Sequence, residues 1–425
     1  MQLVAYGSQD VYLTGNPQIT FWKVVYRRHT NFALESVRQD FNGTVRSGSN
    51  VVATISRNGD LIHKAYLEVK PKSRVTNIAD VIDTVELEIG GQQIDKHQGS
   101  WMDTWNELSL PLSKQAGWNG MTQSLLTNSA PLEDIADPAL PQSTSVGGIL
   151  YEKSGSTITK FEWDGANNKW VKSTGDLTGA TGSLVAPTTY TPDTSFSGTG
   201  TNSKLDLGFV CYKWETNQWV KYTYSQDNLF IPLEFFFCTN PGLALPLIAL
   251  QYHEVRLKFT LGDKVQDAEL WVDYVYLDTD ERRRMAQSSH EFLITQLQHQ
   301  GESNPTNARL NFNHPVKELV WKYDSGVTTG NHKLTLNGHD RMAPRDWKYF
   351  NKVQPYQHHT RVPTSNDIGV YSFALKPEDS QPSGSCNFSR IDNAQLTVSG
   401  DCDIWAVNWN VLRIMSGMGG LAYSN

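Results

Sequence analysis

The sequence predicts an all-β protein built from short antiparallel strands, and three observations support this prediction. Many short segments alternate apolar and polar side chains, which is the period of a strand with one buried face. Gly, Pro and Asn separate these segments and provide turns. The same order of strand patterns occurs twice along 425 residues, a length that exceeds what one hydrophobic core usually serves.

The densest apolar segment runs from Leu229 to Leu261. Residues 255–261 alternate apolar and polar side chains and predict a strand with one wet face. Residues 230–237 are almost entirely apolar and predict a strand covered on both sides, with Glu234 as the single charge. Asn240, Pro241 and Gly242 then predict a turn. A membrane helix is the alternative, but prolines interrupt the run before the roughly 20 apolar residues that a bilayer requires.

The first series of strand patterns precedes this segment. Gly90 and Gly91 follow an alternating run and predict a hairpin, because glycine reaches the positive φ of tight turns. Residues 100–108 predict a helix, with Ser100 and Asp103 as its capping box. The strands themselves are expected at residues 51–56, 61–69 and 81–89.

Residues 142–226 differ in composition, being rich in Ser, Thr, Gly and Asn, and predict an insertion. They contain a repeated unit in which two tryptophans flank a polar turn, so we expect small hairpins. The rings could stack on sugars, but mutual packing in a small core is the favoured role. The four tryptophans are Trp163, Trp170, Trp214 and Trp219.

A second series of strand patterns begins near His290. The segment LEIGG at residues 87–91 corresponds to LTLNG at 334–338, and residues 272–277 correspond to 407–412. A duplicated β-domain is the simplest explanation, and many short strands favour sandwiches of the jelly-roll kind. The second-series strands are expected at residues 308–312, 319–323, 334–336, 371–375, 394–398 and 407–414.

Charge and cysteine content exclude several classes of protein. The net charge is −7, and the basic run Arg282–Arg284 follows acidic residues, so nucleic-acid binding is disfavoured. The four cysteines are scattered and form no C-x-x-C pair, which favours a reducing compartment over a zinc site or a disulfide framework. The N-terminus lacks the basic and apolar regions of a signal peptide.

No catalytic, cofactor or metal site is predicted, because P-loop, dinucleotide, nucleophile-elbow and H-E-x-x-H motifs are absent from the sequence. His253-Glu254 lacks the second histidine of a zinc motif. Adjacent His358 and His359 have no evident carboxylate partner. Glu86 and Glu88 could imitate a glycosidase pair, but alternating Glu on the wet face of a strand is the favoured interpretation.

Two sequons are candidate N-glycosylation sites, Asn42-Gly-Thr and Asn387-Phe-Ser. Such triplets also arise by chance, and the sequence indicates no route into the secretory pathway. Both asparagines therefore stay candidates only.

Several long motifs resemble a known family. They include QLVAYGSQDVYLTGNPQITFWKVVYRRHTNFALES, VELEIGGQQIDKH, PGLALPLIALQYHEVRL, WVDYVYLDTDER, YSFALKPEDSQPSGSCNFSRIDNA and NVLRIMSGMGGLAY. Together they resemble the major capsid protein of nucleocytoplasmic large DNA viruses, in the form found in algal and giant viruses. The resemblance spans nearly the whole chain except the insertion. It implies a double jelly roll: two consecutive eight-stranded antiparallel jelly rolls with short helices and a β-hairpin insertion in the first.

The resemblance also implies a structural function without catalysis or cofactor. Three copies are expected to form a homotrimer, a pseudo-hexagonal capsomer that tiles an icosahedral shell of a virion assembled in the host cytoplasm. Neighbouring capsomers and minor capsid proteins are the expected partners. The inner virion membrane would be contacted only indirectly, and no direct sequence-specific nucleic-acid contact is expected.

The expected division is an N-terminal arm at 1–26, a first jelly roll at 27–286 and a second at 287–425. The insertion at 142–226 is expected to form an outer cap, with its four tryptophans as candidate contacts. Some family members carry glycans on outer loops, but no such position transfers here. The alternative function is a carbohydrate-binding or glycan-hydrolysing β-sandwich protein, which native mass would distinguish from a trimer.

Overall fold

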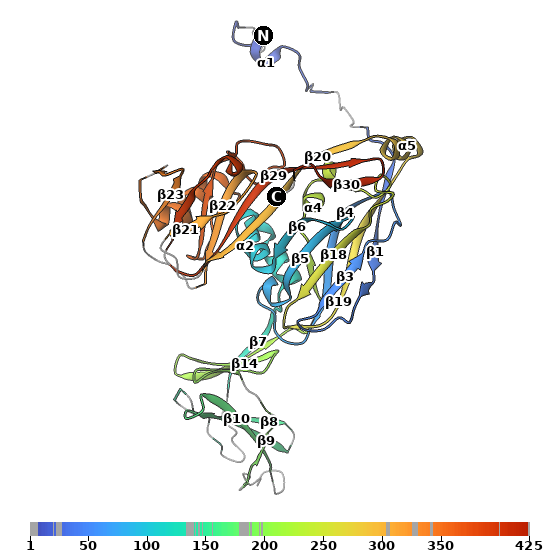
Figure 1. The fold of residues 1–425 in the computed structure, drawn as a ribbon. Helices are drawn as coiled ribbons and strands as arrows, with labels where there is room; N and C mark the ends of the chain where they lie inside the picture. Colours follow the sequence, from blue (N-terminus) through green and yellow to red (C-terminus); the bar gives the residue numbers. More distant parts are fainter. Residues whose placement is uncertain are drawn as a thin grey trace, which may run out of the picture.

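Two β-sandwiches lie side by side and form the body of the protein, and a smaller pair of sheets projects from one end (Figure 1). The computed structural model describes residues 7–19, 21–22, 28–132, 140, 142, 145–146, 148–154, 156–177, 187, 189–194, 196, 199–302, 307–324, 330–340, 343–398 and 400–423. The predicted arm at 1–26 and insertion at 142–226 therefore lie partly outside the described residues.

The first sandwich is formed by strands from both sides of the insertion. Its strands are β1 (Phe32–Gln39), β2 (Phe41–Asn42), β3 (Asn50–Thr54), β4 (Leu61–Pro71), β5 (Ile82–Ile89), β6 (Gln92–Gln98), β16 (Leu229–Pro232), β17 (Leu245–Pro246), β18 (Val255–Leu261) and β19 (Val265–Leu277). One sheet has the order β1-β19-β4-β16, with β17 also beside β4, and the other has the order β2-β3-β18-β5-β6. All of these neighbours pair antiparallel.

The second sandwich is continuous in sequence. Its strands are β20 (His290–Glu302), β21 (Asn307–Leu310), β22 (Pro315–Tyr323), β23 (Asn331–Leu336), β24 (His339–Asp340), β25 (Arg345–Asp346), β26 (Ile368–Ser372), β27 (Cys386–Asn387), β28 (Ala394–Thr397), β29 (Cys402–Met415) and β30 (Met418–Leu421). One sheet has the order β20-β29-β22-β26, and the other has the order β21-β28-β23-β24. Three short strands, β25, β27 and β30, pair at the margins.

The two sandwiches repeat one topology, which confirms the predicted duplication. The order β1-β19-β4-β16 corresponds to β20-β29-β22-β26, and β3-β18-β5-β6 corresponds to β21-β28-β23-β24. The matching motifs lie at matching places. Gly90 and Gly91 turn between β5 and β6 with φ of 58° and 86°, and Asn337 and Gly338 turn between β23 and β24 with φ of 53° and 72°. Both hairpins thus use two consecutive residues of positive φ.

The sheet β20-β29-β22-β26 is buried on both faces and couples the two sandwiches. On one face, Leu319 and Trp321 belong to the core of the second sandwich. On the other face, Val320 and Trp405 belong to the core of the first sandwich. Antiparallel sheets commonly have one wet face, so burial of both faces is a tertiary feature of this protein. Eight residues of the second sandwich join the first core: Ile294, Val320, Ile368, Val370, Trp405, Val407, Leu412 and Ile414.

Short helices fill the ends and the junction. They are α1 (Val11–Thr14), α2 (Gly99–Ser109), α3 (Gln115–Thr122), α4 (Phe236–Thr239), α5 (Thr279–Gln287) and α6 (Gln354–His358), with single turns η1 (Ile78–Asp80), η2 (Leu112–Lys114), η3 (Pro241–Leu243), η4 (Tyr349–Val353) and η5 (Phe388–Arg390). In the described part of the chain, we find no helix with the length and apolar character needed to cross a membrane.

Helix α2 confirms the helix predicted at 100–108, but the predicted capping box is wrong. The N-cap residue is Gln98, which makes no side-chain cap hydrogen bond. Asp103 instead accepts hydrogen bonds from the backbone N–H groups of Ile78 and Ala79, at 2.9 and 3.2 Å. The carboxylate thus satisfies the start of η1 rather than its own helix, because the two helical segments pack together at this point.

The prediction for the apolar segment at residues 229–261 is partly confirmed and partly wrong. Strand β18 confirms the alternating pattern at 255–261. The strand predicted at 230–237 is confirmed only as far as Pro232, where β16 ends, and is wrong beyond it, because Phe236 begins the helical turn α4. A short apolar run cannot distinguish a buried strand from a buried helical turn by periodicity alone. The turn predicted at 240–242 is confirmed, with the Asn240 side chain accepting from the Gly242 N–H at 2.9 Å.

The projecting sheets form a separate small core in which both tryptophan hairpins occur as predicted. Their strands are β7 (Leu126–Pro131), β8 (Ile149–Ser154), β9 (Thr157–Asp164), β10 (Lys169–Asp176), β11 (Thr191–Pro192), β12 (Thr199–Thr201), β13 (Lys204–Asp206), β14 (Val210–Glu215) and β15 (Gln218–Tyr224). One sheet has the order β11-β10-β9-β8, and the other has the order β12-β13-β14-β15-β7. Because β7 pairs with β15, the chain leaves and re-enters the body at neighbouring positions.

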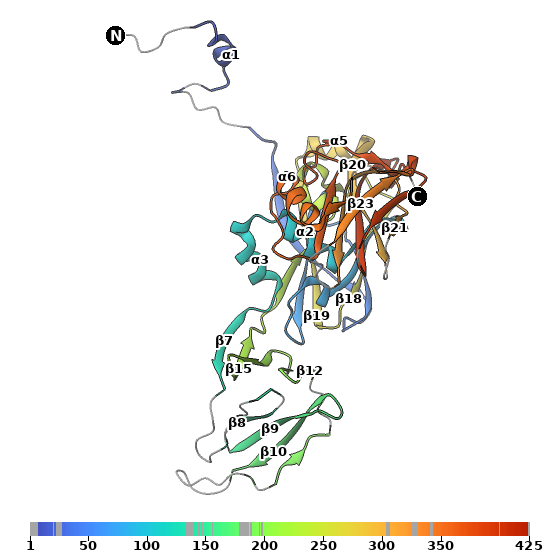
Figure 2. The ribbon, with the colours of Figure 1, turned by 90° about the vertical axis from the view of Figure 1, so that its left-hand side faces the viewer.

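The described part of the N-terminal arm lies at the opposite end of the molecule from the insertion in both views (Figures 1 and 2). It includes α1 and continues to β1 at Phe32. Several of its apolar side chains are exposed: Val11, Tyr12, Leu13, Ile19, Phe21 and Trp22.

Candidate functional site: the junction between the two sandwiches

The four candidate tryptophans of the insertion are brought together in one cluster. Trp163 lies opposite Trp170 and Trp214 lies opposite Trp219 in the hairpin registers. Ring centroids are 5.6 Å apart for Trp163–Trp170, 5.7 Å for Trp170–Trp219 and 5.5 Å for Trp214–Trp219. Trp170 and Trp219 are each 1% exposed. Any external contact of the cluster would therefore have to use the half-buried Trp163 and Trp214.

The two candidate glycosylation sites lie far apart in the chain and on different sandwiches. Asn42 ends the short strand β2 and is exposed. Asn387 is also exposed, and its side chain accepts a hydrogen bond from the Ser389 N–H at 3.1 Å as the cap of η5. Both asparagines are exposed, so exposure favours neither of them over the other as a glycosylation site.

The glutamates considered as a glycosidase pair are compensated by neighbouring cations. Glu86 lies 2.8 Å from Lys96 on the adjacent strand β6. Glu88 forms ion pairs with Lys258 and Arg256 on β18. These cross-strand pairs account for both carboxylates. The expected wet face is wrong for Glu88, which is only 7% exposed, because the side chains beside it cover it.

Helix α2 is the element that brings the two sandwiches together. Its Trp101 ring lies 5.6 Å from the ring of Trp405 on β29. Its Glu107 carboxylate accepts hydrogen bonds of 2.9 and 3.0 Å from the backbone N–H groups of Thr364 and Ser365. Trp405 also donates its indole N–H to the Gln98 side chain at 2.9 Å. Burial would raise the pKa of Glu107, but these hydrogen bonds lower it below its usual value.

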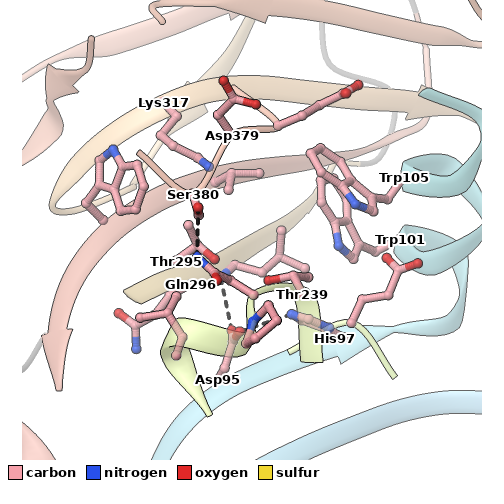
Figure 3. A pocket seen from close by; sticks show the side chains of 18 residues that line it. Asp95, His97, Trp101, Trp105, Thr239, Thr295, Gln296, Lys317, Asp379 and Ser380 are labelled. Carbon is pink, nitrogen blue, oxygen red and sulfur yellow. Dashed lines mark hydrogen bonds and ion pairs between the residues drawn. The ribbon is translucent and has the colours of Figure 1, made fainter. Parts of the chain in front are cut away.

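A cavity of about 320 Å³ lies within this junction (Figure 3). Asp95, His97, Trp101 and Trp105 line it from the first sandwich, and Lys317 and Asp379 project into the same region from the second. Asp95 lies where the two sandwiches meet. Its carboxylate accepts hydrogen bonds from the Leu297 N–H of the second sandwich and from the His97 side chain of the first, both at 3.0 Å. The remaining lining residues are Glu234, Thr239, Asn240, Pro241, Leu243, Thr295, Gln296, Leu297, Glu378, Ser380, Val407 and Trp409.

Beside the cavity, His359 lies between two carboxylates, a cluster that the sequence did not reveal. Its Nε2 lies 2.9 Å from Glu318 and its Nδ1 lies 3.0 Å from Glu378. The side chains of His359 and Glu318 are fully buried. No carboxylate partner of His359 was evident from the sequence, and the structure supplies two. Glu318 comes from β22 and Glu378 from a loop, so only the tertiary structure brings them together.

The charge state of this cluster follows from its geometry. Burial alone would lower the pKa of His359, but the Glu318 carboxylate and then Glu378 raise it to about 9. Burial would raise the pKa of Glu378, but the hydrogen bonds from His359 and Thr360 lower it below its usual value. A histidinium held by two carboxylates thus fastens the end of α6 to the loop at residues 376–380. The signal in the sequence was the charged pair Lys317-Glu318 inside an apolar strand pattern.

Two further ionisable groups are buried at the cavity. Burial raises the pKa of Glu234 to about 7, with His97 and Asn106 opposing that shift. Burial lowers the pKa of Lys317, whose ammonium donates to the Pro377 carbonyl at 2.6 Å and lies 4.6 Å from the centre of the Trp409 ring. The junction therefore combines apolar packing with a polar interior.

Comparisons with known proteins agree with this architecture. A profile described as the major capsid protein N-terminus matches residues 20–278, and one described as large eukaryotic DNA virus major capsid protein matches residues 281–331 and 322–420. The major capsid protein of Pyramimonas orientalis virus is 43% identical, covering 100% of this chain and 99% of that protein. That of Paramecium bursaria Chlorella virus 1 is 37% identical, with the same coverage. A chain of the PBCV-1 virus capsid superposes with a TM-score of 0.67 at 33% identity, covering 96% of this chain and 100% of that one.

Two jelly rolls joined in one chain define the class of double jelly-roll viral capsid proteins. Within that class, the chain belongs to the major capsid protein family of large eukaryotic DNA viruses. Its function is structural rather than enzymatic, and it is a component of the virion shell. The junction is then a structural contact between the two sandwiches of the chain.

Proposed function

We propose that three copies of this chain form a pseudo-hexagonal capsomer that tiles an icosahedral shell. The observation that carries this proposal is the repeated topology, in which β1-β19-β4-β16 and β20-β29-β22-β26 have the same strand order. Two equivalent rolls per chain give six per trimer, so a threefold particle presents nearly sixfold sides to its neighbours. A single set of lateral contacts can then be reused between neighbouring capsomers across a flat facet.

Native mass spectrometry and negative-stain imaging of the purified chain test this proposal. The expected result is a stable particle of three chain masses with a hexagonal outline. A monomer that binds or cleaves glycans would contradict the proposal and support the carbohydrate-active alternative.

The proposal divides the chain into an arm at 1–26, a first roll at 27–286 and a second roll at 287–425, with residues 142–226 as the outer cap. The position of the insertion at the end opposite the arm supports an outward orientation (Figure 1). Deletion of residues 126–224 joins Leu125 to Ser225, which are already neighbours, since the Ser225 N–H donates to the Leu125 carbonyl at 2.8 Å. Trimers should persist without the distal density. Failure to form trimers would mean that the insertion is part of the capsomer core.

The opposite end is proposed to face the virion interior, where the exposed apolar arm would contact minor capsid proteins. Removing residues 1–26 should leave trimers intact and abolish co-purification of those proteins from assembled particles. The inner membrane would be reached only through them. The net charge of −7 argues against direct sequence-specific contact with the genome. If the truncated chain retained its partners, the arm would not be their binding site.

We also propose that the shell assembles in the host cytoplasm. Asn42 and Asn387 are the candidate positions for glycans on it. Fluorescence imaging of tagged chains during infection would locate assembly, with nuclear accumulation as the contrary outcome. Intact-mass measurement before and after glycosidase treatment would test Asn42 and Asn387, and Asn→Gln variants of each would assign any mass difference.

A further inference from the structure

The junction cavity contains polar atoms that are buried without a hydrogen-bond partner. They are Glu234 Oε2, His97 Nδ1 and Trp409 Nε1, and none has a partner within the described ranges of the chain. His97 and Trp409 are only 5% and 6% exposed. Because buried polar groups in proteins are nearly always paired, three such atoms around one cavity indicate that a bound species satisfies them.

The wall from the first sandwich requires a hydrogen-bond donor. His97 Nε2 lies 3.0 Å from the Asp95 carboxylate, so this nitrogen carries the proton and donates. In the neutral ring, Nδ1 is then an acceptor, as is the Glu234 carboxylate. On the other wall, the Trp409 N–H is a donor, and a water molecule held between it and the bound species would accept from it.

The charge in the cavity favours a cation. Asp95, Glu234, Glu378 and Asp379 contribute four carboxyl groups to the lining, whereas Lys317 contributes the one ammonium group among the lining residues. The positive charge of His359 balances the negative charge of the Glu378 carboxylate, and the Lys317 ammonium is already engaged by Pro377 and Trp409. The adjacent rings of Trp101 and Trp105 add apolar surface for the hydrocarbon part of an organic cation.

The cavity also has an entrance. Thr239, Pro241 and Asp379 are exposed lining residues, whereas His97, Trp101 and Trp409 are buried. A volume of about 320 Å³ admits a short alkyl chain and excludes a folded partner. Asp379 at the entrance carries the charge that would attract a positive ligand.

We propose that this cavity binds a small primary alkylammonium ion, whose N–H groups donate to Glu234 and His97. A primary ammonium has three donors, enough for both acceptors and one water molecule. Its alkyl chain would lie against Trp101 and Trp105. These direct contacts all come from the first sandwich, and the water molecule would link the ion to Trp409 of the second, so that the bound ion stiffens the junction independently of how many copies associate.

Affinity should depend on pH through Glu234, because its carboxylate must be ionised to attract the cation. With a pKa of about 7, roughly ten times more Glu234 is ionised at pH 8 than at pH 6. Other ionisable groups face this residue from β6, α2, α4, the second sandwich and an adjoining groove. They are Asp95, His97, Asp103, Cys238, Lys317, Glu378, Asp379, Lys64, Lys114 and Asp273.

Calorimetric titration of the full-length assembled protein tests the proposal with three probes of matched kind. Butylammonium has both charge and N–H donors, 1-butanol has the chain without the charge, and tetramethylammonium has the charge without N–H donors. Only butylammonium should bind in the millimolar range. Equal binding of 1-butanol, or no binding of butylammonium, would overturn the proposal.

Variants assign the binding to this cavity. Glu234→Gln should weaken butylammonium binding about tenfold and remove most of its pH dependence. Asp379→Asn, which changes an exposed side chain, should weaken binding about threefold and guards against misfolding of the first variant. The matched control Glu291→Gln changes an exposed carboxylate that pairs with Arg413 and should leave the affinity unchanged. Wild-type affinity in Glu234→Gln, or equal loss in Glu291→Gln, would place binding elsewhere.

Discussion

At the scale of single residues, the buried ionic cluster around His359 is the most consequential feature. A buried charge is costly unless it is paired, and removal of one partner leaves the other uncompensated. Glu318 has no solvent exposure, so it depends on the histidinium for its charge balance. His359 therefore joins the end of α6 to β22 and to a loop of the second roll, and its ring lies 6.1 Å from that of Trp105 on α2 of the first.

The variant His359→Gln should destabilise the protein by about 3 to 5 kcal/mol, because it leaves Glu318 buried without its cation. Chemical denaturation gives the free energy of unfolding. His299→Gln is the matched control, since His299 pairs with Asp403 at 2.8 Å near the surface and should cost no more than about 1 kcal/mol. Equal losses in the two variants would show that the burial of the cluster is unimportant.

The same cluster predicts a dependence of stability on pH. His359 has a folded pKa of about 9, above its unfolded value of 6.5, so its contribution is complete only below pH 6.5 and declines from there until it is lost as pH rises through 9. The lowered pKa of Glu378 acts in the opposite direction, and its contribution is lost as pH falls below its ordinary value. From pH 7 to 10, wild type should lose on the order of 3 kcal/mol more than His359→Gln. Parallel denaturation curves at both pH values provide the measurement, and identical losses would contradict the assignment.

At the scale of elements, helix α2 depends on a close approach of backbone at its first residue. A Cβ on Gly99 would lie 2.0 Å from the Ile82 carbonyl oxygen and 2.6 Å from the Ala79 Cα atom. A Cβ on Gly117 in α3 would meet nothing within 4 Å among the described residues. Glycine is thus required at one helix and merely tolerated at the other.

Gly99→Ala should destabilise the protein by about 3 kcal/mol, because neither backbone contact can move aside. Gly117→Ala should instead stabilise it by roughly 0.5 to 1 kcal/mol through the better helix propensity of alanine. Thermal unfolding of both variants tests the pair. A neutral Gly99→Ala variant would mean that α2 can shift without disturbing the junction.

The insertion should behave as an independent element, because its core residues form a cluster separate from those of the body. Trp219→Ala should cost the insertion about 3 to 5 kcal/mol and unfold it locally. Hydrogen exchange should then accelerate at residues 149–224 and stay unchanged in the two rolls. Trp163→Ala, at a half-buried position, is the milder control. Faster exchange throughout the body would show that the insertion supports the rolls.

Elements were predictable to different degrees for physical reasons. Strands with one wet face, such as β5 and β18, carry the alternation that reveals them. The apolar run through Phe235–Phe237 carries no such contrast, so its helical turn was missed. The capping box at Ser100 failed because Asp103 found better partners in η1, which is 20 or more residues away in sequence.

At the scale of the whole molecule, the two rolls share a core and should unfold together. Calorimetry should give one main transition for both rolls, with any separate transition belonging to the insertion. Trp405→Ala, which changes the shared core, should reduce the free energy of unfolding of both rolls by about 3 to 5 kcal/mol and move that single transition to a lower temperature. Trp219→Ala is the control that should leave it in place. Two roll transitions, with only one of them displaced, would contradict the shared core.

The sequence by itself determined the all-β class, the duplication, the hairpins and the separate insertion, because these depend on local periodicity and turn chemistry. It also carried the resemblance that implied a capsid protein. Only the tertiary structure decided that one antiparallel sheet is buried on both faces, since that depends on how the rolls dock. The same docking brought His359 to Glu318 and Glu378, and enclosed the cavity beside Glu234. Contacts between distant segments have no local pattern, so residues that act across the junction cannot be recognised before the chain has folded.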